Sequence, residues 1–236
     1  MSARRSRLDR LIAKQLGISR DAVPMLLARR RIKVDGNVVD ARDLLVDGFS
    51  IITVDDQLIQ AQAAVYLMLH KPCGVLSATK DSRHPVVTDL VDHAEVAGLH
   101  IAGRLDLHAS GLLLLTNDGT WSRQLSDPVH GVSKLYEVNL KHPVSTDYVA
   151  AFAAGMYFSY ENITTRPAQL EILGECTVRV TLQEGRYHQI KRMFGRFRNP
   201  VLGIHRIAIG NLALDAALRP GQWRELSSSQ VHAAAR

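Results

Sequence analysis

The chain has 236 residues, 46% of them hydrophobic, and it carries a formal net charge of +6 at pH 7 with a pI near 9.5. This composition excludes a disordered chain, and no apolar run reaches the roughly 18 residues that a bilayer-spanning helix needs. The basic N-terminus lacks a long apolar stretch followed by a cleavage site, so we expect a cytoplasmic protein. The positive charge favours a polyanionic partner, although many basic proteins are merely soluble.

Two short helices are predicted at the start of the chain. Apolar residues recur at helical spacing over residues 8–16, and Gly17 follows where a left-handed cap would end the helix. Ser19 is suited to cap a second helix, which tolerates Pro24 only in its first turns. That second helix is expected to end at the three arginines of residues 29–31.

Short strands are predicted after these helices. Residues 32–39 alternate apolar and polar side chains around an Asp-Gly turn signal, which predicts a β-hairpin. A second Asp-Gly pair at residues 47–48 begins a further pair of short strands. Residues 57–64 are mostly small and polar, and we expect them to form a linker.

The helices, the basic cluster and the hairpin together resemble the S4-type RNA-binding domain. The resemblance implies a small RNA-binding domain over residues 1–60, joined to a second domain over residues 61–236. Its contacts with RNA would be made by basic side chains near the end of the second helix, namely Arg20, Arg29, Arg30, Arg31 and Lys33. The alternative is that arginines at a helix C-terminus only complement the helix dipole and remain solvated.

The second domain is predicted to be α+β, with a mostly antiparallel mixed sheet. Strand-like runs occur at VYLML, GLLLLT and KLYEVNL, and residues 176–182 alternate strictly between apolar and polar side chains. Such alternation is typical of a half-buried antiparallel strand. Helical patterns cover residues 148–154 and the segment HQIKRMFGRF, in which four apolar side chains share one face.

Neither the cysteines nor the histidines suggest a metal site. Cys73 and Cys176 form no CxxC pair, so we expect two ordinary buried thiols and neither a disulfide nor a zinc site. The ten histidines show no HExxH or other ligand spacing. We therefore expect no metal.

The segment GRLDLHASGLLLLTNDG, residues 103–119, is the most informative stretch of the chain. A loop with Arg104 and Asp106 leads into an apolar strand and then into an Asn-Asp-Gly turn. Taken alone, the two charged residues could form an exposed ion pair of little energetic value. The glycines of the segment permit tight turns and a close approach of substrate to the backbone.

This motif resembles the signature of the RsuA/RluA-type pseudouridine synthases, whose catalytic aspartate corresponds to Asp106. Two further segments match the family in the same order. KLYEV supplies Tyr136 as the active-site tyrosine, and EGRYHQIKRMF supplies Ile190 and Lys191 as the apolar and basic active-site pair. The resemblance extends over nearly the whole chain to the closing segment GIHRIAIGNLALDAALRPGQWREL.

The overall likeness is greatest to the small-subunit branch of the family, which modifies uridine 516 of 16S rRNA. It implies 16S rRNA, or a small-subunit assembly intermediate, as the partner of a protein that we expect to be a monomer. Enzymes that modify large-subunit (23S) rRNA share the S4-type domain and all three motifs, so they remain an alternative. A non-catalytic rRNA-binding assembly factor is the second alternative.

The sequence departs from the family pattern at Ala109, where a threonine is usual, and Ser110 follows it. The hydroxyl is thus displaced by one position. If that hydroxyl orders the catalytic loop, the activity or the rigidity of the loop would differ.

The implied isomerisation breaks the N1–C1′ bond of a uridine and joins C1′ to C5, with no gain or loss of atoms or electrons, so no cofactor is expected. The uridine must be flipped out of the RNA to be reached. Asp106 must be ionised, and burial opposes ionisation, so a cation such as Lys191 is needed nearby. Tyr136 would stack on the uracil, Ile190 would pack on its other side, and Arg104 would hold the phosphate or fill the vacated space.

Each of these side chains also has a simpler interpretation. Lys191 is one charge of a basic cluster that ends the segment EGRYHQIKRMFGRFR, and Arg104 could only support its loop. Tyr136 in a strand and Ile190 on an apolar helix face are the kinds of residue that usually fill a core.

Overall fold

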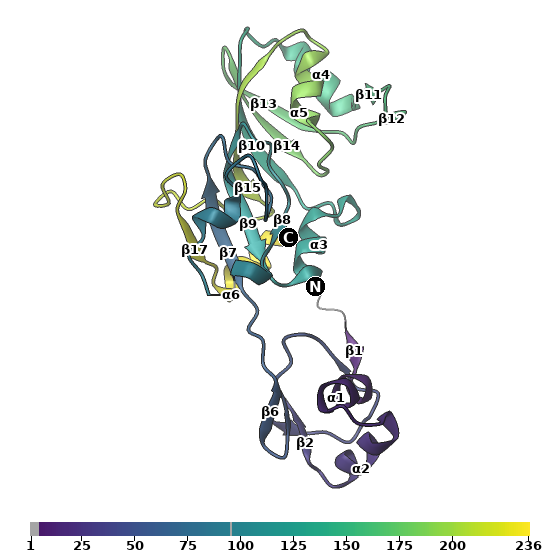
Figure 1. Cartoon of the computed structure of the whole chain (residues 1–236). Helices are drawn as coiled ribbons and strands as arrows, with labels where there is room; N and C mark the ends of the chain where they lie inside the picture. The colour runs from purple at the N-terminus through teal and green to yellow at the C-terminus, as the bar shows by residue number, and fades with distance from the viewer. Residues whose placement is uncertain (1–4, 95) are drawn as a thin grey trace. The chain divides into compact units, whose positions relative to one another are not determined.

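The computed structural model describes residues 5–94 and 96–236, which form two compact units (Figure 1). The first unit comprises the described residues up to Ala64, together with Asn117–Thr120, and the second comprises Val65–Thr116 and Trp121–Arg236. Residues 1–4 of the predicted first domain lie outside the described residues. Within the described ranges, no helix combines the length and the apolarity needed to cross a membrane.

The helices of the first unit follow the local sequence signals. Helix α1 (Leu8–Leu16) ends at Gly17, whose φ of 66° is left-handed, as predicted. The Ser19 side chain accepts a hydrogen bond from the Asp21 N–H and caps a 3₁₀ turn, η1 (Arg20–Ala22), which continues into α2 (Val23–Ala28). Pro24 lies in the first turn of α2, where its missing N–H costs no hydrogen bond.

Two small sheets complete the first unit. Strand β1 (Ser6–Arg7) pairs with β4 (Leu45–Val46), and the second sheet has the order β3 (Asn37–Val38), β2 (Ile32–Val34), β5 (Ile52–Val54), β6 (Gln57–Gln60). The predicted hairpin is confirmed, because Asp35 and Gly36 both have positive φ angles between β2 and β3. The predicted linker was wrong over its first half: residues 57–60 form the edge strand β6, whose polar composition concealed its pairing with β5.

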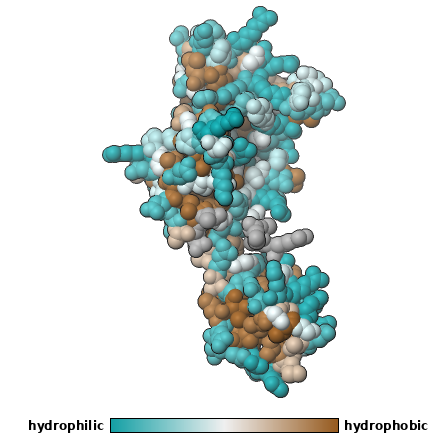
Figure 2. Space-filling model, in the orientation of Figure 1, coloured by the Kyte–Doolittle hydropathy of each residue, from teal (hydrophilic) through white to brown (hydrophobic). Residues whose placement is uncertain are grey.

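The core of this unit is formed by apolar side chains from both helices and from the strands, including Leu8, Ile12, Val23, Ile32 and Ile52. Figure 2 shows hydrophobic residues gathered on the visible face of the smaller unit, and its exposed apolar side chains include Met25, Leu45 and Leu58. Hydrophilic residues predominate on the visible face of the larger unit.

The second unit is built on a nine-stranded mixed sheet. Its main path runs β13 (Gln169–Gly174), β14 (Thr177–Leu182), β10 (Lys134–Leu140), β15 (Val201–Ile209), β9 (Ala109–Thr116), β7 (Tyr66–Lys71), β17 (Trp223–Glu225). Strand β8 (His100–Ala102) pairs with β9, and β16 (Leu212–Ala213) pairs with β15. Among the described strands, all pairings are antiparallel except that of β15 with β9. The expected mixed, mostly antiparallel sheet is therefore confirmed.

Helices cover both faces of this sheet. Helices α4 (Thr146–Ala154) and α5 (Gln189–Gly195) pack Phe152 and Phe194 into the same core as Leu113 of β9. Helices α3 (Gly119–Ser126) and α6 (Ser228–Ala234) contribute Trp121 and Ala234 to a separate core with Leu112. Because neighbouring residues of a strand point to opposite faces, the two cores lie on opposite sides of the sheet.

The remaining elements are short. Strands β11 (Tyr157–Phe158) and β12 (Ile163–Thr164) pair with each other and form a two-stranded antiparallel ribbon. The 3₁₀ turns η2 (Val87–Leu90), η3 (Val96–Gly98) and η4 (Pro128–His130) lie in the connections.

The expectation that both cysteines are buried was wrong. Cys73 is exposed in the loop after β7, and Cys176 is half-buried in the turn between β13 and β14. Both are free thiols, and the Cys73 thiol donates a weak hydrogen bond to the His108 carbonyl at 3.4 Å. Connections between strands run over the surface, which explains the exposure of these two positions.

Candidate active site

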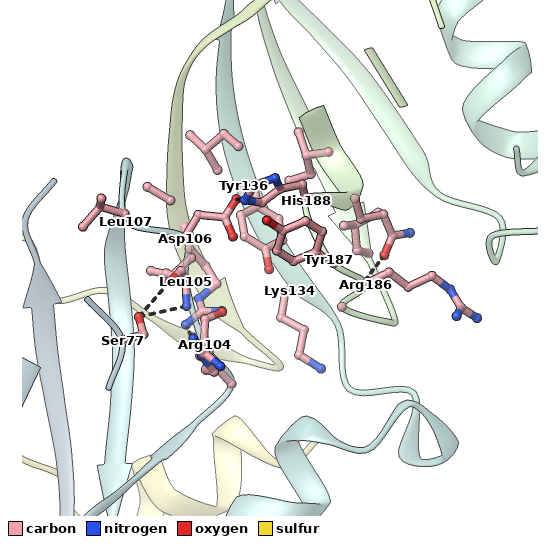
Figure 3. Close-up of a pocket in the computed structure, with 18 of the residues that line it drawn as sticks. Ser77, Arg104, Leu105, Asp106, Leu107, Lys134, Tyr136, Arg186, Tyr187 and His188 are labelled. Carbon is pink, nitrogen blue, oxygen red and sulfur yellow. Dashed lines mark hydrogen bonds and ion pairs between the residues drawn. The ribbon is translucent and has the colours of Figure 1, made fainter. Parts of the chain in front are cut away.

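A cavity of about 750 Å³ opens on the second unit, between the β8–β9 loop and the start of α5 (Figure 3). Its lining includes Arg104 and Asp106 from the loop, Tyr136 from β10, and Ile190 from α5. Four of the five side chains predicted for catalysis and substrate binding therefore line one pocket, although they come from three separate segments of the sequence.

Asp106 lies beside two potential cations. Its Oδ2 is 3.8 Å from Lys191 Nζ and 3.7 Å from His188 Nε2, and the Asp106 side chain is 30% exposed. Lys191, the fifth predicted residue, is thus next to the carboxylate. In the part of the chain that is described, Asp106 forms no ion pair with Arg104, whose exposed side chain lies at the edge of the pocket.

Tyr136 and Ile190 belong both to the pocket and to the core. Each is less than a tenth exposed, and each packs within the same apolar cluster as Phe194. The Tyr136 ring also lies 6.0 Å from the guanidinium carbon of Arg206. The structural and functional interpretations of these residues are therefore compatible, because the core supports the apolar wall of the pocket.

Lys71, which the sequence did not single out, supports the loop that carries Asp106. Its fully buried ammonium donates to the carbonyls of Ala109 at 2.7 Å, Pro72 at 3.0 Å, Asp106 at 3.2 Å and Leu107 at 3.3 Å. Burial lowers the pKa of Lys71 to about 8, against the opposing attraction of Cys73 and Asp106. The loop backbone is thus folded around a buried cation.

Arg206 supports the same loop from β15. It is 1% exposed, and its Nη2 donates to the Gly103 carbonyl at 2.8 Å, its Nε to Leu112 at 2.8 Å and its Nη1 to Arg104 at 3.4 Å. One signal in the sequence could have revealed it. The run VLGIHRIAI is otherwise mostly apolar, and a charged residue two positions after Ile204 shares its face.

Gly111 allows β15 to approach β9 closely enough for this arrangement. Its φ is 107°, and a β-carbon there would lie 2.3 Å from the backbone oxygen of Arg206. The glycine of the motif therefore accommodates a neighbouring strand. Sequence reasoning had assigned the motif's glycines to turns and to the approach of substrate.

Lys134 is a second buried cation, beside Arg206, in the wall of the pocket. It is 5% exposed, lines the cavity, and donates to the Val132 carbonyl at 2.8 Å. Burial, assisted by the positive charge of Arg206, lowers the pKa of Lys134 to about 8.

The departure from the family pattern at residues 109 and 110 has a clear structural consequence. Ala109 lines the pocket, and its N–H donates to the Asp106 carbonyl at 3.1 Å. Ser110 points to the opposite face of the sheet, where its hydroxyl is 2.9 Å from His205 Nδ1. The Ser110 hydroxyl therefore does not order the loop that carries Asp106, and hydrogen bonds from the Lys71 ammonium and within the loop backbone supply that order.

The loop between β14 and α5 places His188 and Tyr187 at the pocket. Buried Glu184 accepts hydrogen bonds from Arg186 Nε at 3.0 Å and from Gln189 Nε2 at 2.9 Å. His188 has a φ of 49°, an uncommon left-handed conformation for a residue other than glycine. Sequence reasoning missed both His188 and Tyr187, although they lie within the motif that supplied Ile190 and Lys191.

The five side chains predicted to contact RNA lie on the first unit and fall into two groups. Three are engaged in ion pairs: Arg20 with Asp9, Arg31 with Asp55, and Lys33 with Asp56. Arg29 and Arg30 are exposed, and neither has an ion-pair partner among residues 5–94 and 96–236.

Asp9 shows that Arg20 has a structural role. Burial alone would raise the pKa of Asp9, but hydrogen bonds from Arg20 and Arg7 outweigh it and lower the pKa from 3.8 to about 2. Arg20 Nη2 is 3.0 Å from the Asp9 carboxylate, which is almost completely buried.

No group of three or more histidine, cysteine, aspartate or glutamate side chains is arranged to hold a metal ion in the described residues.

Comparison with known proteins gives consistent matches. Residues 65–195 match the family model described as RNA pseudouridylate synthase. The chain is 48% identical over 226 residues to the ribosomal small subunit pseudouridine synthase A of Pseudomonas aeruginosa, covering 95% of this chain and 98% of that protein. The Escherichia coli protein of the same name is 40% identical over the same shares. A crystal structure of a pseudouridylate synthase matches with a TM-score of 0.71 at 37% identity, over 97% of this chain and 99% of that one.

Proposed function

Because this chain belongs to the RNA pseudouridylate synthase family, we propose that it converts one uridine of small-subunit 16S rRNA, of the position 516 type, to pseudouridine. Pseudouridine synthases are isomerases, and the mixed sheet of the second unit has their fold. The choice of rRNA is supported by relatives named ribosomal small subunit pseudouridine synthase A, which match 95% of the chain. We also propose that the protein acts in the cytoplasm and as a monomer.

Asp106 is the proposed catalytic carboxylate. The reaction breaks the N1–C1′ bond, turns the uracil, joins C1′ to C5, and moves the proton from C5 to N1. An ionised carboxylate can contribute by attacking C1′, by attacking the ring, or by accepting a proton during glycal formation. In all three routes Asp106 must carry its negative charge, and Lys191 Nζ and His188 Nε2 both lie within 4 Å of its carboxylate.

The pocket walls suit a uracil that has been flipped out of the RNA. Tyr136 offers an aromatic ring for stacking, and Ile190 offers an apolar surface beside it. Arg104 has an exposed guanidinium at the edge of the pocket, where it would hold a phosphate or fill the space that the uridine leaves. Tyr136 would also offer its hydroxyl for proton transfer at C5.

The first unit is the proposed S4-type RNA-binding domain. Its two helices, its arginine cluster and its hairpin have the order typical of that domain. Arg29 and Arg30 are its strongest candidates for phosphate contacts, because their guanidinium groups have no carboxylate to compete with RNA within the described residues. Arg20, Arg31 and Lys33 would have to exchange an existing ion pair for a phosphate.

One observation carries the proposal of Asp106: three segments that are distant in sequence bring Asp106, Tyr136 and Ile190 to one pocket, with Lys191 Nζ 3.8 Å from the Asp106 carboxylate. If these residues only filled the core or the surface, nothing would require their side chains to meet at one pocket. The same arrangement also argues against a scaffold that has lost its catalytic residues.

The test is incubation of wild-type protein, Asp106→Asn and Asp147→Asn with small-subunit rRNA, with small-subunit assembly intermediates and with large-subunit rRNA, followed by site-resolved detection of pseudouridine. Asp147 is an exposed aspartate of α4 and serves as the matched control. We expect product from wild type and Asp147→Asn, and none from Asp106→Asn. Product from Asp106→Asn would refute its catalytic role. Modification confined to large-subunit rRNA would refute the target, and RNA binding without any product would favour an assembly factor.

A further inference from the structure

Tyr187 combines an exposed position with a fixed orientation. It lines the pocket yet is 76% exposed, so its ring stands at the mouth of the cavity. One face of the ring lies on the His188 imidazole, with ring centroids 4.0 Å apart and an interplanar angle of 20°. Figure 3 shows both side chains on the side of the pocket opposite Ser77 and Arg104.

The surrounding contacts hold this ring at a defined distance from Asp106. His188 Nε2 lies 3.7 Å from the Asp106 carboxylate, so Tyr187, His188 and Asp106 form a continuous row. The loop beneath them is braced by buried Glu184, which accepts hydrogen bonds from both Arg186 and Gln189. The Arg186 N–H donates to Gln189 Oε1 at 3.0 Å, which closes the loop. An aromatic ring held in this way loses little side-chain freedom when it binds a ligand.

The target uracil does not need this ring, because Tyr136 and Ile190 line the interior of the pocket. Flipping a nucleotide removes its base from the stack and leaves the neighbouring base with one uncovered face. Proteins that bind unpaired nucleotides use exposed aromatic rings as stacking surfaces for such bases.

We propose that Tyr187 stacks on the base of a nucleotide adjacent to the flipped uridine and thereby favours target sites in which that neighbour is unpaired. This inference rests on the proposed function and adds a recognition residue to it. Tyr187 is a binding residue in this proposal, and the chemistry stays with Asp106. The simplest alternative is that the ring only shields His188 from solvent.

Substitution of Tyr187 separates these two roles. Tyr187→Phe keeps the stacking surface, whereas Tyr187→Leu covers His188 but cannot stack as an aromatic ring does. Loss of stacking should weaken RNA binding about 5- to 150-fold, which corresponds to about 1 to 3 kcal/mol. We expect this loss for Tyr187→Leu and Tyr187→Ala, no change for Tyr187→Phe, and an unchanged kcat at saturating RNA. Tyr160→Ala removes a tyrosine that is 95% exposed and is the matched control.

A second measurement identifies the stacked base. A small-subunit rRNA fragment that wild type converts is prepared with an abasic nucleotide on the 5′ or the 3′ side of the target uridine. On one side, the abasic nucleotide should weaken wild-type binding by the same factor as Tyr187→Ala, and it should have no further effect on that variant. Equal effects on wild type and Tyr187→Ala at both sides would overturn the inference, as would a Tyr187→Leu variant that binds like wild type. Absence of product from wild type would instead overturn the proposed function.

Discussion

Replacing Arg206 with lysine should distinguish the positioning of the Asp106 loop from the presence of a buried charge. The Arg206 guanidinium binds two parts of the chain, donating from Nε to the Leu112 carbonyl in β9 and from Nη2 to the Gly103 carbonyl in the loop, both at 2.8 Å. Lysine keeps the positive charge, but it has one nitrogen and no rigid fork of donors. The two carbonyls are bound by different nitrogens of the guanidinium, and the single Nζ of lysine can take the place of only one of them, so we expect one of the two bonds to be lost.

The bonds that lysine gives up set the expected loss of stability. A hydrogen bond that involves a charged group contributes about 1.5 to 3 kcal/mol. Arg206→Lys loses one of the two short bonds, and also the 3.4 Å bond to the Arg104 carbonyl, which we count as a fraction of a bond. The free energy of unfolding should fall by about 2 to 4 kcal/mol. A domain with the usual stability of about 5 to 15 kcal/mol would remain folded.

The catalytic effect should be larger than the effect on substrate binding. The Gly103 and Arg104 carbonyls precede Asp106 by only three and two positions, so a loop released at these carbonyls moves the carboxylate. A misplacement of about 1 Å can cost about 100-fold in rate, so we expect kcat to fall about 100-fold while KM changes less than about 3-fold. A residue with a purely structural role would not produce this separation of kcat from KM.

The assay combines urea unfolding with steady-state pseudouridine formation on small-subunit rRNA. Arg224→Lys is the matched control, because Arg224 pairs with Asp215 at a partly exposed site where the change should cost less than about 1 kcal/mol. The reasoning would be refuted if Arg206→Lys retained wild-type kcat. It would also be refuted if its loss of stability matched that of Arg224→Lys.

Three further changes test other parts of the structure. Gly111→Ala should lower the free energy of unfolding by about 2 to 6 kcal/mol, because its β-carbon would overlap the backbone of β15; a variant with the wild-type urea midpoint would contradict this. Replacing Arg29 and Arg30 together by alanine should reduce the slope of log affinity against log salt by about 1.5 to 2, and Lys14→Ala, on α1, should leave it nearly unchanged. The lowered pKa of Asp9 stabilises the fold above pH 4, and this contribution is lost as the pH falls from about 4 to about 2. Asp9→Asn should therefore be less stable than wild type at pH 7, with a difference in Tm that disappears towards pH 2; a constant difference would argue against the ion pairs.

Local signals in the sequence predicted the elements whose cause is local. Gly17 ends α1 with its own backbone, and the Asp35-Gly36 pair makes the β2–β3 turn with two positive φ angles. The apolar face of α5 was visible because Ile190, Met193 and Phe194 recur at helical spacing. Strand β6 was missed because an edge strand on the surface needs no apolar alternation.

The buried side chains that hold the Asp106 loop, Arg206 and Lys71, could not be predicted from local signals. Arg206 is 103 positions from Gly103, whose carbonyl it binds, and Lys71 is 38 positions from Ala109. Each interaction depends on the order of strands in the sheet: Arg206 on the parallel pairing of β15 with β9, and Lys71 on the antiparallel pairing of β7 with β9. Residue type also argues against a prediction that Lys71 and Arg206 are buried, because lysine and arginine are rarely buried. The resemblance to the family identified Asp106, while the contacts of Lys71 and Arg206 with its loop were identified from the fold.

Three buried cations surround the pocket and the loop that carries Asp106. Lys71, Lys134 and Arg206 are all at least 95% buried, and none of the three has a carboxylate ion-pair partner in the described residues. Burying cations without partners is costly, and that cost appears as the lowered pKa values of Lys71 and Lys134, both about 8. Attraction to Asp106 opposes this shift at Lys71. Asp106→Asn would therefore remove the carboxylate and also lower the pKa of Lys71 further. A lower pKa would weaken the hydrogen bonds from the Lys71 ammonium to the loop carbonyls. If RNA binds at this pocket as proposed, a phosphate at its mouth would supply negative charge near these cations, and we expect substrate binding to increase the order of the loop.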